Sequence, residues 1–297
     1  SIFQTKTVDE LIGGSGPAGS GMKRTLTTFD LVMLGIGAVI GAGIFSSIGT
    51  AAVGEVAPDG TVIRYGAGPA LTLSFVLLGA VCALAGLCYA ELTAMIPVSG
   101  SAYTYAYATL GELVAWIIGW DLILEYAVGN VAVAIAWSGY FASFLRFFGI
   151  EIPFWLCHSY RDVAFSYPEH MDKLPILFGH HIAINVPAIV IVGLITWLLV
   201  IGVKESAHVN NVMVVIKLSV LALFIGVGFF YIEPTNWVPF APNGWRGVMN
   251  GAAIVFFAYI GFDAISTAAE ETKDPQRSMP RGILWSLAIC TVIYVIV

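Results

Sequence analysis

The sequence GIGAVIGAGIF at residues 35–45 decides the fold, because its glycines interrupt an apolar run that is otherwise long enough to cross a membrane. A second stretch, FFAYIGFD at residues 256–263, interrupts another such run. Inside a bilayer, backbone N–H and C=O groups can leave a helix only where they face protein or a water-lined cavity. Two interruptions therefore predict a ligand site where two spanning helices unwind.

The composition places the chain in a membrane. Of its 297 residues, 58% are hydrophobic and 11% are charged, and the mean hydropathy is +0.87. Soluble domains carry about 25% charged residues. The net charge of -6 is spread along the chain without a basic patch, so nucleic acid is excluded as a partner. The four cysteines lack metal-ligand spacing, and we expect no metal and no cofactor.

Seven apolar runs are long enough to cross roughly 30 Å of hydrocarbon, which takes about 20 residues. We therefore expect an all-α polytopic membrane protein. The runs cover residues 29–52, 69–95, 113–144, 182–203, 209–231, 248–269 and 282–297.

Basic residues flank the first run on its N-terminal side and follow the sixth run, so the positive-inside rule places both regions in the cytoplasm. Residues 1–28 are expected to form a cytosolic segment with a glycine-rich linker at 13–21. The protein is then a multi-pass plasma-membrane protein with a cytoplasmic N-terminus. The basic residues are Lys6, Lys23, Arg24, Lys273, Arg277 and Arg281.

Residues 95–111 are too polar to span a membrane. Tyrosines recur there at every second position, a period that a strand would also show. A short interfacial helix is our interpretation of this segment.

The glycines of the first stretch have a second explanation. Small residues four positions apart, such as Gly37 and Gly41, let two membrane helices pack closely. The second stretch favours a ligand site, because Asp263 costs about 2.5–3.5 kcal/mol near the centre of a spanning helix unless it faces a polar cavity. Two interruptions about five runs apart also fit an inverted repeat.

Unwound helices expose groups of opposite polarity. Around Ala42 and Gly43, free N–H groups would begin a second half-helix, whose positive dipole end suits a carboxylate. In the second stretch, the carbonyls of Phe257, Ala258 and Ile260 can accept hydrogen bonds from an ammonium group. A zwitterionic α-amino acid matches this pair of sites.

Three motifs in order carry a family resemblance: GAGIF at 41–45, PVSGSAY at 97–103, and residues 256–271 followed by KDPQR at 273–277. They resemble the amino acid–polyamine–organocation (APC) transporters, and within that superfamily the cationic amino acid transporter branch and its bacterial relatives. The resemblance implies two inverted repeats of five helices with the first and sixth unwound. Residues 29–231 would be the first repeat and 232–297 the start of the second, so that the chain holds about seven of a dozen spans.

The resemblance also implies residue roles. The substrate carboxylate would lie on the backbone of Ala42 and Gly43, its amino group on the second-stretch carbonyls, and Phe257 would act as an aromatic gate. Asp263 matches an acidic position near the pocket. The expected substrate-binding set is Val39, Ala42, Gly43, Phe257, Ala258, Ile260, Asp263 and Glu125.

Lys217 is the expected coupling residue. It occupies the middle third of the fifth run, where an unpaired ammonium is costly; the alternative is a lysine snorkelling to the interface. In sodium-independent relatives a lysine at this position replaces the sodium ion, which implies proton coupling or uniport. If the ammonium lost its proton, contacts to the first helix would be released and gating would follow proton movement.

Glu125 is the candidate for recognising a cationic substrate side chain. Asp121 lies one helical turn earlier, so that the two carboxylates form one acidic stripe or divide between the pocket and a packing partner. We favour Glu125, because Asp121 is closer to the cytosolic end.

The sequence thus predicts a secondary active transporter of amino acids, proton-coupled and sodium-independent, in a bacterial inner membrane. Its partners would be an amino acid, membrane lipid, a proton and an unidentified small membrane protein. The alternative is a transport-inactive sensor or accessory subunit with the same fold, since fold does not determine function. An enzyme is not expected, because the loops hold no nucleophile–base pair or phosphate loop.

Overall fold

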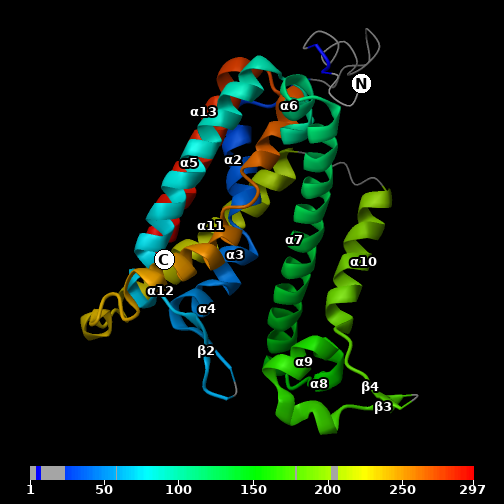
Figure 1. Ribbon diagram of the computed structural model, residues 1–297, viewed down its shortest axis with the longest axis vertical. Helices are drawn as coiled ribbons and strands as arrows, with labels where there is room; N and C mark the ends of the chain where they lie inside the picture. The colour runs from blue at the N-terminus through cyan, green and yellow to red at the C-terminus, as the bar shows by residue number, and fades with distance from the viewer. Residues whose placement is uncertain (1–4, 8–23, 58, 178, 202–206) are drawn as a thin grey trace. The chain divides into compact units, whose positions relative to one another are not determined.

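The computed structural model describes residues 5–7, 24–57, 59–177, 179–201 and 207–297, and the chain is mostly helical (Figure 1). The predicted linker at 13–21 and Lys23 lie outside the described residues. The α-helices are α2 (Thr28–Val39), α3 (Ala42–Ser46), α4 (Ile48–Val53), α5 (Leu71–Met95), α6 (Ser101–Thr109), α7 (Glu112–Phe147), α8 (Phe154–Cys157), α9 (Tyr160–Ser166), α10 (Val186–Ile201), α11 (Ala207–Phe229), α12 (Gly244–Val255) and α13 (Pro275–Ile296). Short 3-10 helices are η1 (Gly68–Ala70), η2 (Pro168–Lys173), η3 (Pro234–Trp237), η4 (Phe256–Ala258) and η5 (Asp263–Glu271).

Two small hairpins modify the all-α prediction. Strand β1 (Gly54–Val56) pairs with β2 (Val62–Tyr65), and β3 (Ile176–Leu177) pairs with β4 (His180–His181), both antiparallel. They lie in connections between apolar helices, so they close loops and add no layer to the core.

Six helical segments of the described chain are long and apolar enough to cross a membrane, one fewer than the seven predicted. The fourth predicted run corresponds to α10, which has 16 residues and whose apolar part is shorter than a span. Its predicted end at Val203 lies outside the described residues. The other six runs each coincide with a membrane-length segment.

The last helix begins at Pro275, seven residues before the predicted start of its apolar run at 282. Proline is favoured in the first turn of a helix, where its missing N–H has no acceptor to lose. The polar residues 276–281 lie outside the predicted run, because apolar length alone set its boundary. The proline in the first turn, rather than hydropathy, marks where α13 starts.

The segment 95–111 contains the helix α6, which confirms the short helix predicted there. Its preceding loop is bonded to η5, because Ser99 N donates to Glu270 Oε1 at 3.0 Å. Tyr105 is buried in α6, with its ring edge-to-face on Tyr89 at 6.1 Å between centroids.

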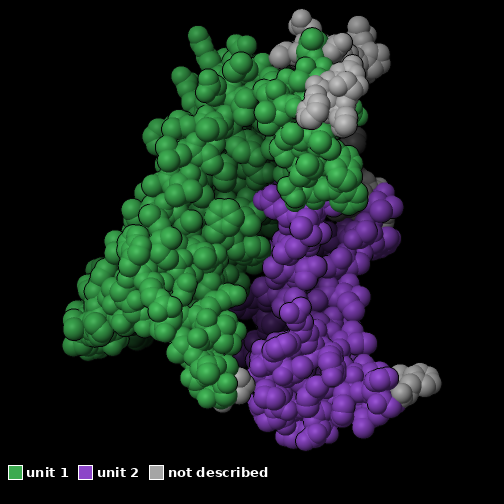
Figure 2. All heavy atoms as spheres, in the orientation of Figure 1, with its two compact units in different colours: residues 1–122, 205–297 green, residues 123–204 purple. Residues whose placement is uncertain are grey.

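The chain divides into two compact units, coloured separately in Figure 2. Unit 1 comprises residues 1–122 and 205–297, and unit 2 comprises residues 123–204. Unit 1 therefore contains both glycine stretches and all of α11. The assignment of 29–231 and 232–297 to two repeats stays a prediction.

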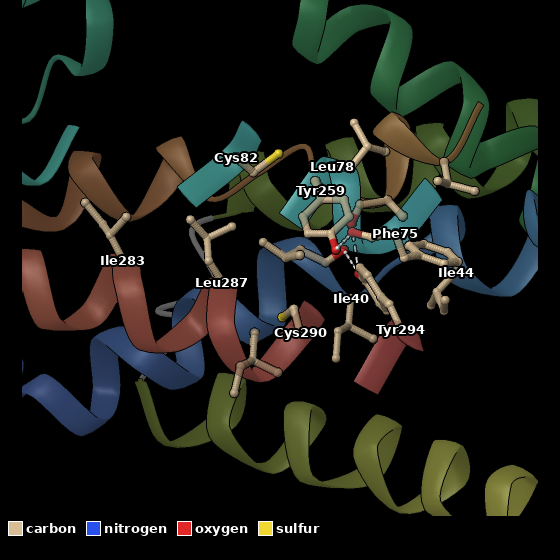
Figure 3. Packing of buried hydrophobic residues seen from close by; sticks show 14 of the residues in the cluster. Ile40, Ile44, Phe75, Leu78, Cys82, Tyr259, Ile283, Leu287, Cys290 and Tyr294 are labelled. Carbon is tan, nitrogen blue, oxygen red and sulfur yellow. Dashed lines mark hydrogen bonds between the residues drawn. The ribbon is translucent and has the colours of Figure 1, made fainter. Parts of the chain in front are cut away.

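Unit 1 has a core in which α5 and α13 pack side by side and α2 packs on α13 (Figure 1). Three rings lie at its centre: Tyr294 is 5.4 Å from Phe75 and 5.3 Å from Tyr259 between centroids. Figure 3 shows them among Ile40, Ile44 and the aliphatic side chains of α5 and α13. The apolar residues around both glycine stretches thus belong to one core.

The N-terminal approach to α2 is tied to the connection between η5 and α13. Leu26 forms a parallel bridge with Thr272, in which Leu26 N donates to Glu271 O at 3.0 Å and Lys273 N to Leu26 O at 3.0 Å. Thr27 then caps α2 through a reciprocal pair of bonds with Asp30. Arg24 and Lys273, one from each basic region assigned to the cytoplasm, therefore lie at the same end of unit 1.

Candidate functional site

The first glycine stretch contains a real break. Helix α2 ends at Val39, Ile40 has an extended conformation (φ -76°, ψ 95°), Gly41 is non-helical, and α3 begins at Ala42. The start of α3 at Ala42 is where the sequence predicted a second half-helix. Amide groups in the first turn of a helix have no acceptor in a preceding turn, so Ala42 and Gly43 carry the N–H groups of this end.

The carbonyls freed at the end of α2 are bound by a lysine from another helix. Lys217 in α11 donates from Nζ to Gly37 O and to Ile40 O, each at 2.6 Å. An ammonium group has three protons and no acceptor capacity, so it is well suited to cap carbonyls. Lys217 therefore closes the C-terminal end of α2 from the side, half-buried rather than reaching for the interface.

A tyrosine joins the first break to the second. The Tyr294 hydroxyl in α13 lies 2.9 Å from Val39 O and 2.8 Å from Ala258 O, so one donor serves two carbonyls. The side chain is 1% exposed. Tyr294 thus links the last carbonyl of α2 to the last carbonyl of η4.

The second glycine stretch breaks in a different way. Helix α12 tightens into η4 at Phe256, the chain turns through 259–262, and η5 continues from Asp263. Gly261 has φ +114°, which L side chains rarely adopt, and a Cβ there would lie 2.9 Å from Ala38 O. Glycine is required at Gly261 by both conformation and space.

The two breaks touch. A Cβ on Gly43 would lie 2.4 Å from Ala258 Cα, so the backbone of α3 packs directly on that of η4. Gly41, by contrast, has open space where a Cβ would be. The close-packing role that small residues have in membrane helices therefore falls to Gly43, beside the break itself.

Unit 1 brings together most of the predicted substrate set. Val39, Gly43 and Ala258 are buried where the breaks meet, and Asp263 is 6% exposed at the start of η5. Ala42, Phe257 and Ile260 are half-buried in the same two segments. Glu125 is half-buried in the part of α7 that belongs to unit 2, so its relation to the breaks stays a prediction.

Two tyrosines of this region were not among the predicted site residues. Tyr294 caps both breaks, and the Tyr259 hydroxyl lies 3.0 Å from Phe75 O. Each was assigned to the apolar run around it. A buried tyrosine hydroxyl generally finds a hydrogen-bond partner, so a tyrosine in the middle of a spanning run is the signal that identifies such residues.

Two cavities are lined by none of the predicted substrate residues. A cavity of about 750 Å³ in unit 1 is lined by Tyr294, Phe75 and residues of α4 and η3, but by none of the predicted substrate residues. A cavity of about 600 Å³ lies within unit 2, at the end of α7. The backbone groups of the breaks, rather than a preformed cavity, define the candidate site in the described residues.

Comparison with known proteins identifies the family. The family model described as amino acid permease matches residues 26–297. The chain is 49% identical over 297 residues to the branched-chain amino acid permease BcaP of Bacillus subtilis (strain 168) and 47% identical over the same length to the methylthioribose transporter of that organism. It is 39% identical over 282 residues, 94% of its length, to the chloroplastic cationic amino acid transporter 9 of Arabidopsis thaliana.

The whole chain aligns with both bacterial proteins but spans 58% of each, and it spans 45% of the plant transporter. These relatives are transporters, so the family is not one of enzymes. With the breaks, the capping lysine and the six apolar spans, the match over 26–297 shows that this multi-pass membrane protein belongs to the amino acid permease family of the APC superfamily.

Proposed function

We propose that the protein is a secondary active transporter that moves amino acids across the plasma membrane, coupled to protons and independent of sodium. The observation that carries this proposal is the contact of Gly43 with Ala258. It places the first amide groups of α3 beside the carbonyl groups of η4. A zwitterion needs donors and acceptors close together, and the meeting of the breaks supplies both.

The carboxylate binds the first amides of α3 at Ala42 and Gly43, where the helix dipole favours an anion. The Ala258 carbonyl is already held by the Tyr294 hydroxyl at 2.8 Å. The substrate ammonium is therefore assigned to the carbonyls of Phe257 and Ile260, with Ala258 available when the tyrosine turns to Val39. Asp263 supplies negative charge on the cytosolic side of the same segment.

Coupling is assigned to Lys217. Its two bonds to α2 tie protonation to the shape of the first break. A protonated amine supplies donors to both carbonyls, whereas a neutral amine binds them more weakly. Loss of the proton would free the end of α2, and an ammonium at this place leaves no need for a sodium ion.

The proposal also names the kind of substrate side chain that is accepted. Relatives are named for branched-chain and cationic amino acids and for methylthioribose. Glu125 favours cationic substrates, because a half-buried carboxylate stabilises a guanidinium or ammonium group. We propose that arginine and lysine are accepted beside small neutral amino acids.

The proposed architecture is two inverted repeats of five helices with a cytoplasmic N-terminus. The support is the position of the two broken spans, first and sixth among the predicted runs, and the pairing of Leu26 with Thr272, which brings both basic ends to one side. An inverted repeat places its substrate site between two such helices.

Uptake of labelled alanine, leucine and arginine into proteoliposomes tests the proposal, at two pH values and in sodium-free buffer. We expect uptake that rises with an inward proton gradient and is unchanged by sodium. Binding of amino acid without flux would instead identify a sensor. Uptake that requires sodium would overturn the coupling assigned to Lys217.

A further inference from the structure

The cavity in unit 2 lies at the end of a helix that is longer than a membrane crossing. Helix α7 has 36 residues, which corresponds to about 54 Å, against roughly 30 Å of hydrocarbon. Its end carries the exposed rings of Phe144, Phe147 and Phe148. Exposed tryptophan and tyrosine side chains are typical of the interface with lipid headgroups, and Trp137 and Tyr140, two to three turns before the end of α7, are exposed as well.

Stacked aromatic rings form one wall of this cavity. The ring of Phe154 is stacked between His158 at 4.3 Å and His170 at 4.5 Å, and Tyr167 lies edge-on to Phe154 at 5.5 Å. His158 Nδ1 is 2.6 Å from Asp162 Oδ2, which holds the histidine in place. Phe154, His158 and Tyr167 all line the cavity.

Two opposite charges line the same cavity. Arg146 comes from the last turn of α7, and Glu151 from the loop that follows. Among the described residues, the ion pairs of unit 2 are His158–Asp162 and His170–Glu169, and neither includes Arg146 or Glu151. A guanidinium group binds phosphate in a bidentate manner, and a carboxylate accepts hydrogen bonds from a primary ammonium.

The volume of about 600 Å³ is in the range of small-molecule sites, about 300–1,000 Å³. A free amino acid such as alanine would fill only a small part of it. A phosphoethanolamine headgroup with its glycerol is larger and carries the two charges that Arg146 and Glu151 complement. We propose that this cavity binds the headgroup of a phospholipid with a primary ammonium, with its phosphate on Arg146 and its ammonium on Glu151.

The test measures lipid retention by the purified, delipidated protein in native mass spectrometry. The probes are dioleoyl phosphatidylethanolamine, phosphatidylcholine, which lacks ammonium N–H groups, and phosphatidylglycerol, which lacks the cation. We expect about tenfold tighter binding of phosphatidylethanolamine, because each charge-assisted bond contributes to affinity. Equal binding of the three lipids would overturn the proposal.

Two substitutions test whether the lipid headgroup binds in this cavity. Arg146→Gln and Glu151→Gln should each weaken phosphatidylethanolamine binding about tenfold. The matched controls Arg161→Gln and Asp172→Asn remove charges of unit 2 that do not line the cavity, and should change nothing. Equal losses in the controls would overturn the assignment to this cavity.

Glycine substitutions give a steric test that leaves all charges in place. Gly139 lines the cavity and has open space where a Cβ would be, so Gly139→Leu should fill it and abolish preferential binding. Gly129→Leu on the same helix, also in open space, is the control. Persistent binding in Gly139→Leu would contradict the proposal, and thermal unfolding shows whether each variant is folded.

Soluble competitors separate the two sources of zwitterionic chemistry. Glycerophosphoethanolamine should displace the lipid, and L-alanine should not. Alanine binding that depends on Glu151, without lipid preference, would replace the lipid assignment by a free amino acid. Because uptake is not measured, the result stands apart from the proposed transport function.

Discussion

At the first break, the carbonyls freed at the end of α2 are bound by side chains from two other helices, whereas at the second break the backbone largely bonds to itself. Lys217 and Tyr294 donate hydrogen bonds to carbonyl groups of the first break. At the second, Tyr259 N donates to Phe256 O at 2.9 Å and Ala264 N to Gly261 O at 3.1 Å. The first break thus depends on a titratable amine and a rotatable hydroxyl, and the second mainly on backbone geometry, with the same hydroxyl on Ala258 O.

The difference assigns separate tasks to two similar stretches of sequence. A break held by side chains can change when a proton or a ligand competes for its carbonyls, since a ligand shifts an equilibrium only through differential contacts. A break held mainly by 3-10 bonds and a glycine with positive φ has less freedom to change, although its Ala258 carbonyl is bonded by the Tyr294 hydroxyl. We expect the first break to move and the second to stay fixed during transport.

The largest effect is expected from Gly43→Ala, which forces the two breaks apart. The new Cβ would lie 2.4 Å from Ala258 Cα, a backbone atom that cannot turn away. Overpacking of this kind costs about 3 kcal/mol. Thermal unfolding should show the loss, and uptake should fall to background. Gly41→Ala, in open space two residues earlier, is the control, and equal effects for both would refute the contact.

Lys217→Ala is expected to have the second-largest effect, because it leaves the carbonyls of Gly37 and Ile40 without their donor. Unsatisfied buried acceptors cost about 2 kcal/mol. We expect lower thermal stability and uptake that no longer depends on pH. Ser219→Ala, on the same helix but exposed, should change neither. An unchanged pH dependence in Lys217→Ala would remove the lysine from the coupling mechanism.

Tyr294→Phe sharpens the comparison, because it removes only the hydroxyl shared between the breaks. Val39 O and Ala258 O would lose their common donor, at a cost of about 1 kcal/mol. We expect the affinity for substrate to change, as measured by isothermal titration. The packing of the aromatic rings should change little, as measured by thermal unfolding. Tyr103→Phe on the exposed face of α6 is the control. Identical titrations for Tyr294→Phe and wild type would exclude a role in joining the breaks.

The smallest effect concerns a residue outside both breaks. Glu125→Gln should reduce arginine uptake several-fold, about 1 kcal/mol in transition-state terms, and leave alanine uptake near wild type. Asp121→Asn, one turn away, is the matched control. Equal losses of arginine and alanine uptake would mean that Glu125 has a structural role. Substrate selectivity would then depend on residues of the two breaks.

The glycine spacing located both breaks to within a few residues, because helix interruption is a local property of the chain. Lys217 was predictable for a similar reason, since a charge in an apolar run needs a partner. Tyr294 was not, because its partners Val39 and Ala258 lie 255 and 36 residues away in sequence and only the packed core brings them together. The division into units was also beyond the sequence, because it depends on which helices pack.

The bridge between Leu26 and Thr272 bears on how the protein is made. Ribosomes add about 5–20 residues per second, so Thr272 emerges roughly 10–50 seconds after Leu26. Lys217 and Tyr294 are also synthesised well after the first span. During that interval the first span has none of the partners that hold its break, and continuous helix is the only form that satisfies its backbone in lipid. We expect the first span to enter the membrane as an unbroken helix and to break at Ile40 only when the later helices reach it.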